Sequence, residues 1–483
     1  NDMAIKHLTY ACIPLIAASM SSQAATVDQL NRQVQKLNQR IAAQDQRFRV
    51  NGFATFGISQ SNEAVAYNDV NDDINFNRFS KIGIQMSFNI DSQNSVVTQL
   101  VSRGENNWET SAEWAYFKHD FNNGFTGKIG RIRLPAFMLS EFLDVGYAVP
   151  WSKMPNESYD SLTPFSNMEG VDLSYNTDVG DLSATVQFAY GRSKSVDYDL
   201  KDVISVNASL QADTWNTKAS YSQADVSVLS ETIESALNLY GTASSGLAGS
   251  FTSLGFTYDP GDVYFTSEYS KLEVDDAVVD ADAIYATVGY RMGRFMPTIT
   301  YAMTESQDDD ERELSVILAN NPYVSDTTQL ATAIAGGLQI IAVVNSDGAA
   351  GAAAAAIAGG AAPTASDLAT VANSNITLVD AGTPASHTAS NIVNQSIIDG
   401  AKAAASGVLN GSAVFQGEQN RNTTRIGLGM RYDMSPGTAL KLQYDIIEVD
   451  GAAGMFNSEA WAAAGASAPD STNILTISID TVF

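Results

Sequence analysis

Segments of about ten residues that alternate apolar and polar side chains recur along this chain, joined by connectors that are alternately short and long. The short connectors carry turn residues, as in Asn122-Asn123-Gly124 and Ser435-Pro436-Gly437. A soluble sandwich has no reason to place all its long loops at one end. A barrel that crosses a bilayer has tight turns on one side and long loops on the other. The spacing therefore predicts a transmembrane β-barrel.

The alternating segments number sixteen, which predicts an all-β fold, a 16-stranded antiparallel transmembrane β-barrel over residues 50–483. We expect strands at residues 50–59, 78–90, 95–103, 112–121, 125–134, 169–176, 182–191, 203–211, 214–222, 251–258, 263–271, 283–291, 295–304, 423–432, 439–448 and 473–483. An even count places every short turn on the periplasmic side. A soluble antiparallel sheet alternates in the same way, but aromatic residues near strand ends, such as Tyr190, Tyr221 and Tyr444, favour a membrane.

The last predicted strand points to the outer membrane. Leu475, Ile477, Ile479 and Phe483 share one face of that strand, and the printed sequence stops at the phenylalanine. This pattern resembles the assembly signal of bacterial outer-membrane proteins. We therefore expect Phe483 to act as an assembly signal.

The first residues have a different pattern. Residues 1–24 read as a secretory signal peptide, with Lys6, a short apolar run and a small-residue cleavage site. This leader contains Cys12, the one cysteine, so the mature chain has no thiol for a disulfide or a Cys-ligated metal. Residues 26–49 then follow a heptad pattern, which predicts a periplasmic α-helical coiled coil with the seam residues Val27, Leu30, Val34, Leu37 and Ile41. Such a seam favours self-association over a solvated amphipathic helix, and leaves dimer and trimer open.

Composition and motifs exclude several classes of function. The net charge of -27 argues against a nucleic-acid partner. The acidic runs lie in connectors, where solvated loops are commoner than divalent-cation sites. His119 and His387 form no catalytic or metal-binding motif with nearby acids or serines. We expect no enzyme activity, no cofactor and no metal; a hydrolase built from dispersed residues on the barrel rim is the weakest of three readings.

Basic residues on the face opposite the apolar one mark a possible lumen. Charged side chains on the lipid face cost about 2–4 kcal/mol at mid-depth, so they should point inward. Seven residues have this placement: Lys81, Arg131, Arg133, Lys218, Arg425, Arg431 and Lys441. They either form a path for anions or pair with acids such as Asp445 and Asp172 and only support the wall.

The third long connector, residues 135–168, is unusually apolar for a loop, with Phe137, Phe142 and Trp151 among its residues. A loop exposed to water does not normally carry so many apolar side chains, so we expect it to pack against the inner wall. Glu141, Asp144 and Glu157 would then face basic wall residues. Opposed charges across such a constriction set selectivity by their local field.

The stretches RVNGFATFGIS (49–59) and GRIRLPAFMLSEFLDVGYAVPWSKMPNESY (130–159) resemble DcaP-type porins of Gram-negative bacteria. The resemblance covers the coiled coil, the strands to about residue 172 and the final strands. It implies a trimeric sixteen-stranded porin with a periplasmic coiled coil that takes up small, often negatively charged solutes such as dicarboxylates. The chain departs from that pattern in the seventh long connector, residues 305–420, which is far longer than a porin needs.

The leading hypothesis is an outer-membrane porin for passive diffusion of small hydrophilic solutes, with anionic solutes as a candidate class. Its expected partners are those solutes, outer-membrane lipid and lipopolysaccharide, and two further copies in a homotrimer. The alternative is a surface-interaction barrel whose large extracellular loop, 305–420, binds a partner or shields the cell. The porin hypothesis and the surface-interaction hypothesis depend on where residues 135–168 and 305–420 lie.

Overall fold

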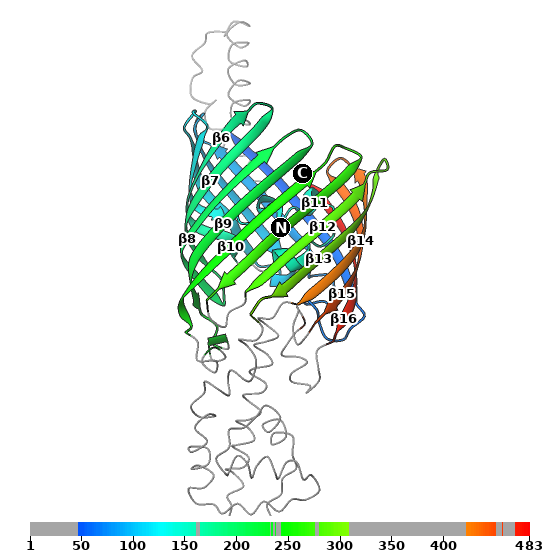
Figure 1. Cartoon of the computed structure of the whole chain (residues 1–483). Coiled ribbons are helices and arrows are strands. Elements are labelled where there is room, and N and C mark those ends of the chain that lie inside the picture. Colours follow the sequence, from blue (N-terminus) through cyan, green and yellow to red (C-terminus); the bar gives the residue numbers. More distant parts are fainter. Residues whose placement is uncertain are drawn as a thin grey trace, which may run out of the picture. The chain divides into compact units, whose positions relative to one another are not determined.

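Sixteen β-strands in an unbroken ring of hydrogen-bonded neighbours form a closed barrel (Figure 1). The computed structural model describes residues 47–160, 165–231, 233–234, 237, 243–275, 280–308, 422–450, 456 and 469–483. The strands are β1 (Phe48–Ser61), β2 (Lys81–Asn89), β3 (Asn94–Arg103), β4 (Thr110–Asp120), β5 (Phe125–Arg133), β6 (Asn167–Val179), β7 (Leu182–Lys194), β8 (Tyr198–Gln211), β9 (Trp215–Val228), β10 (Ser245–Tyr258), β11 (Val263–Val274), β12 (Ala281–Tyr290), β13 (Phe295–Ser306), β14 (Thr423–Ser435), β15 (Thr438–Val449) and β16 (Ser471–Val482). The predicted sixteen-stranded antiparallel barrel is confirmed.

Pairing between the first and last strands closes the ring. β1 runs antiparallel to β16, from the pair Phe53–Val482 to the pair Ser61–Ile474. The backbones of Gly52 and Phe483 exchange two hydrogen bonds beyond that ladder. A side chain at Gly52 would collide with the Phe483 ring, so the last residue packs over the glycine at the closing seam.

The burial pattern of each strand is the reverse of that in a soluble protein. Along β15, Leu442 and Tyr444 are exposed, whereas Lys441, Gln443 and Asp445 are buried. Apolar side chains therefore cover the outside of the barrel and polar side chains face its interior, as hydrocarbon outside and water inside require. Exposed aromatic residues lie near the short-turn ends, among them Phe88, Phe121, Phe125, Tyr258, Tyr290 and Phe295. This is the exterior of a barrel in the outer membrane.

The short turns contain the backbone conformations that their sequences predict. Asn122, Gly124 and Gly437 all have positive φ, of 59°, 88° and 82°. In the described part of the chain, no helix is long and apolar enough to cross a membrane.

The connector between β5 and β6 folds into the barrel. Because β5 ends at Arg133 and β6 begins at Asn167, this connector comprises residues 134–166 rather than the expected 135–168, and we call its described residues, 134–160 and 165–166, the inner loop. It contains the short helices η2 (Ser140–Phe142), η3 (Gly146–Ala148) and α2 (Asn156–Tyr159). A further short helix, η1 (Gly104–Asn106), follows β3.

Three predicted segments lie wholly or mostly outside the described residues: the signal peptide, the coiled coil and the seventh long connector. The signal peptide and the coiled-coil seam fall within residues 1–46, and β1 begins at Phe48, so the last two residues expected in the coiled coil are strand. Contacts divide the chain into the units Asn1–Arg49 and Val50–Phe483. Most of the seventh long connector, residues 309–421, is likewise outside the described residues.

Candidate functional site

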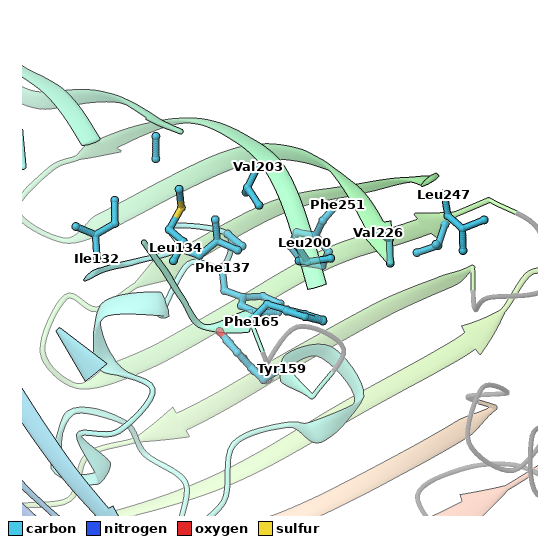
Figure 2. Close-up of a cluster of buried hydrophobic side chains, with 14 of the residues drawn as sticks. Ile132, Leu134, Phe137, Tyr159, Phe165, Leu200, Val203, Val226, Leu247 and Phe251 are labelled. Atoms are coloured by element: carbon cyan, nitrogen blue, oxygen red, sulfur yellow. The ribbon is translucent and has the colours of Figure 1, made fainter. Parts of the chain in front are cut away.

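An apolar cluster attaches one side of the inner loop to the barrel wall. Phe137 packs against Phe251 of β10 and Tyr159 of α2, with ring centroids 4.9 and 4.8 Å apart. Trp151 meets Tyr285 of β12 edge to face at 5.6 Å. Figure 2 shows Phe137 and Tyr159 of the loop in one apolar cluster with wall residues such as Leu200 and Phe251. Burying one such side chain contributes about 1.5–3 kcal/mol, so the cluster fixes the loop and fills the lumen beside β8 to β12.

Basic wall residues hold the loop backbone. Lys218 Nζ donates to the Phe137 carbonyl at 2.8 Å, and Lys81 Nζ donates to that of Leu143 at 3.1 Å. Lys441 Nζ bonds the carbonyls of Gly146 and Trp151 at 2.6 and 2.9 Å. Arg431 Nη1 bonds those of Tyr147 and Val149 at 2.8 and 3.1 Å. Irregular backbone inside a barrel needs partners for its carbonyls, and four of the seven predicted lumen bases supply them.

Three buried ion pairs involve two basic wall residues, Arg425 and Lys441. Arg425 Nη2 lies 3.0 Å from Glu157 Oε2, and Arg425 Nη1 lies 3.7 Å from Asp445 Oδ2. Lys441 Nζ lies 3.0 Å from Asp480 Oδ2. Because each base here has a buried carboxylate beside it, Arg425 and Lys441 support the wall, which is the second of the two readings of these residues.

A charged cluster joins the tip of the loop to β2, β3, β4 and β5. Asp144 Oδ1 accepts from Arg103 Nη2 at 2.8 Å and lies 3.6 Å from Lys81 Nζ, and Asp144 Oδ2 accepts from Arg133 Nη2 at 3.0 Å. Arg103 Nη1 also donates to Glu113 Oε1 at 2.7 Å. We call Lys81, Arg103, Glu113, Arg133 and Asp144 the Asp144 cluster. Burial alone would raise the pKa of Asp144, but Lys81, Arg103 and Arg133 together hold the pKa of this carboxyl well below its usual range.

A cavity of about 470 Å³ lies beside this cluster. It is lined by wall residues from β1 to β5 and the first residue of β6, by the connector between β1 and β2, by η1 and by the inner loop. The ionisable groups in its lining include the bases Arg78, Lys81, Arg103, Arg131, Arg133 and Lys153, and the acids Glu105, Glu113, Asp144 and Asp160. Six bases against four acids give the lining an excess of positive charge.

The remaining two predicted site residues lie apart from the cluster. Arg131 pairs with the exposed Glu169 of β6. The next pair along the ladder on the same face, Ile129 and Val171, is exposed on the outside of the barrel, and Arg131 also borders the cavity. Gly130, with a φ of 132°, interrupts the regular backbone at this point. Glu141 in η2 is exposed and belongs to no ion pair within the described residues.

Six charged residues that line the cavity were not predicted from the sequence: Arg78, Arg103, Glu105, Glu113, Lys153 and Asp160. Three of them show why. Arg103 lies at the end of β3 on the same face as Gln99, so alternation alone would have found it. Glu113 was hidden because a bulge between Gln99 and Leu100 shifts the register of β4. Lys153 has no sequence signal; its ammonium lies 5.2 Å from the ring centre of Phe79.

No protein-family model matches the chain, and no curated protein matches it. Several solved outer-membrane proteins are similar to the chain. They include OmpF of Salmonella typhi (11% identity, 90% of this chain and 97% of the other, TM-score 0.48) and the anion-selective porin of Comamonas acidovorans (10%, 90% and 99%, 0.47). The DcaP channel of Acinetobacter baumannii is similar at 9% identity over 90% of this chain and 97% of that one, with a TM-score of 0.44. Sixteen-stranded barrels with an apolar exterior are the architecture of outer-membrane porins.

Proposed function

We propose that the protein is a porin through which small hydrophilic solutes diffuse passively, and that its constriction lies between the inner loop and the wall formed by β1 to β5. The observation that carries the proposal is the placement of the loop. Apolar packing fills the lumen beside β8 to β12, and the polar cavity remains on the other side. A fixed polar gap through a barrel of this size is a path for water-soluble molecules.

Anions are the preferred solutes in this proposal, and small carboxylates such as dicarboxylates are the class considered. The support is the charge of the cavity lining, six bases against four acids. A net positive field at a narrow point lowers the energy of an anion more than that of a cation.

Measurements in planar bilayers test both parts. We expect purified, folded oligomers to form open channels, and a reversal potential under a KCl gradient that favours chloride. Folded protein without channel activity would overturn the porin proposal. A strong cation preference would overturn only the proposed selectivity.

We also propose a homotrimer, in contact with membrane lipid and lipopolysaccharide elsewhere. Between the middle of the strand and its long-connector end, outward tyrosines occur on alternate strands: Tyr190, Tyr221, Tyr269, Tyr301 and Tyr444. In the described parts of β16 and β1 to β6, the corresponding outward positions carry aliphatic or small residues such as Leu475, Ile58, Ile82 and Leu100. A belt of interfacial aromatics belongs where lipid is, so the sector without it is suited to contact other copies.

Single cysteines can test the interface, because Cys12 is the only cysteine and lies in the expected leader. Ile82→Cys and Ile284→Cys replace the same residue at outward positions of similar exposure, 39% and 42%, on opposite sectors. A short bifunctional thiol reagent should cross-link copies through position 82 and not through position 284. Cross-linking at both positions, or only at 284, would contradict the assignment.

A further inference from the structure

The Asp144 cluster has the composition of a carboxylate-binding site. Three cations surround one carboxylate: Asp144 Oδ1 accepts from Arg103 Nη2 and Nε at 2.8 and 3.2 Å, and Oδ2 accepts from Arg133 Nη2 at 3.0 Å, with Lys81 Nζ 3.6 Å from Oδ1. Counting Glu113, three positive charges face two negative ones. Charge-assisted hydrogen bonds of this kind are the strongest that proteins make to carboxylates.

Two hydrogen-bond donors of the Arg133 guanidinium are unpaired among the described residues. The Arg133 side chain is only 4% exposed, yet its Nε and Nη1 atoms have no hydrogen-bond partner there. Nη1 lies 3.8 Å from Glu113 Oε2, beyond hydrogen-bond distance. The guanidinium stacks over Trp114, with its carbon 5.7 Å from the ring centre, so its orientation is fixed. Buried donors without partners are costly, and an oxygen-bearing anion would satisfy them.

The members of the cluster come from two different sources. Lys81, Arg103, Glu113 and Arg133 are held by the neighbouring strands β2 to β5, whereas Asp144 comes from the inner loop between η2 and η3. Because Asp144 is attached to the inner loop, its carboxylate cannot move freely to the best hydrogen-bonding position. Both Arg103 donors bond to Oδ1, and Arg133 bonds only to Oδ2. A free carboxylate could instead place its two oxygens on the two donors of one guanidinium, the more favourable bidentate arrangement.

We propose that these four wall residues form a binding site for a carboxylate group of the solute, and that Asp144 is an internal occupant which an entering carboxylate displaces. The inference rests on the proposed channel function and adds to it the location and chemistry of one binding step. The exchange replaces one carboxylate by another, so the three cations keep a partner throughout. The cavity beside the cluster provides room for the incoming group.

Removing the internal occupant tests the inference. In Asp144→Ala, acetate should block chloride current through the channel at a concentration about tenfold or more below that needed in the unmodified protein, the factor that one charge-assisted hydrogen bond contributes. Glu141→Ala is the matched control, because it removes a carboxylate from the same loop outside the cluster. Equal block in both variants, or none in Asp144→Ala, would overturn the inference.

A second measurement separates this inference from the channel function. Calorimetric titration of acetate into detergent-purified Asp144→Ala requires no conduction. We expect binding that Asp144→Ala with Arg133→Gln loses, while that double variant retains the heat-resistant folded form on electrophoresis. Acetate binding in a protein that does not conduct would uphold the site and overturn the porin. Channel activity together with no acetate binding by Asp144→Ala would overturn the site and uphold the porin.

Discussion

Lys441 and Asp480 face each other inside the barrel from β15 and β16, with Lys441 Nζ 3.0 Å from Asp480 Oδ2 and both side chains 1% exposed. The same ammonium also donates to the carbonyls of Gly146 and Trp151. One lysine therefore joins the closing strands to the inner loop.

Lys441→Met should destabilise the barrel, because Asp480 would be left buried and unpaired. Losing one member of a buried pair costs about 3–5 kcal/mol. The measurement is the free energy of unfolding by urea in lipid vesicles. Lys271→Met is the control, since Lys271 pairs with Glu273 at the surface and should matter little. Adding Asp480→Asn to Lys441→Met should recover part of the loss; equal effects at Lys441 and Lys271 would refute the role of the pair.

Trp151→Ala should widen the channel. The Trp151 ring packs on Tyr285, and its Nε1 donates to Thr287 and Thr300 at 3.0 and 2.9 Å. Its removal weakens the attachment of the loop to β12 and β13 by about 3–5 kcal/mol. We expect a higher single-channel conductance in planar bilayers. Trp215→Ala on the outer face, where Trp215 packs near Phe256, should leave conductance unchanged; an unchanged conductance in Trp151→Ala would show that the loop does not limit the pore.

Arg133→Gln should shift the reversal potential toward cations more than Arg131→Gln does. Arg133 is buried against Asp144, and its loss leaves the carboxylates of the cluster in excess. Arg131 pairs with Glu169 at a more exposed position, where solvent screens its charge. The potentials are compared under the same KCl gradient. A larger effect at Arg131 would move the selective point away from the Asp144 cluster.

Anion preference should fall as the pH rises from 7 to 9. Burial lowers the pKa of Lys153 to about 8, so this lysine is positive below that pH and neutral above it. Loss of the charge removes one base from the cavity lining. Reversal potentials measured over this range should change in the unmodified protein. The change should be smaller in Lys153→Gln, and an identical pH profile in both proteins would assign the titration to another group.

Replacing residues 309–421 by a short glycine-serine turn should preserve conduction. β13 and β14 remain paired as far as Thr304 and Thr423, so their ends are adjacent and a short turn can join them. The contacts that hold the inner loop involve other residues. Planar-bilayer recordings should show channels of at least the original conductance. Loss of the channel would favour the alternative in which this connector is the functional part.

All sixteen strands could be predicted from alternation, but several extend further than expected at the long-connector end. β8 begins at Tyr198 rather than residue 203, and β9 ends at Val228 rather than residue 222. A bulge between Lys201 and Ile204 interrupts the alternation there. The short-turn ends were located more closely, because glycine and asparagine turns mark them.

The inward direction of most of the predicted bases was predictable, while their partners were not. Alternation indicates which way Lys218 or Arg431 points, but only the folded loop shows that each donates to a loop carbonyl. The apolar residues of the inner loop indicated that it packs inside the barrel, and the structure places it there. Its contact with Arg103, and the pairing of Arg103 with Glu113, depend on strand register, which the sequence pattern does not contain.

The inner loop packs against one side of the barrel wall and leaves the cavity on the other. The two sides of the inner wall should therefore respond differently to amino-acid substitutions. Inward residues of β8 to β12 such as Phe251 and Tyr285 pack against the inner loop, so in the proposed channel substitutions there should alter folding and leave the choice of solute unchanged. Inward residues of β1 to β5 such as Thr55, Arg103 and Arg133 line the cavity that the proposed channel uses. A population of cells under pressure to exclude a toxic solute would accumulate changes in those few strands, and the far side of the same barrel would stay as it is.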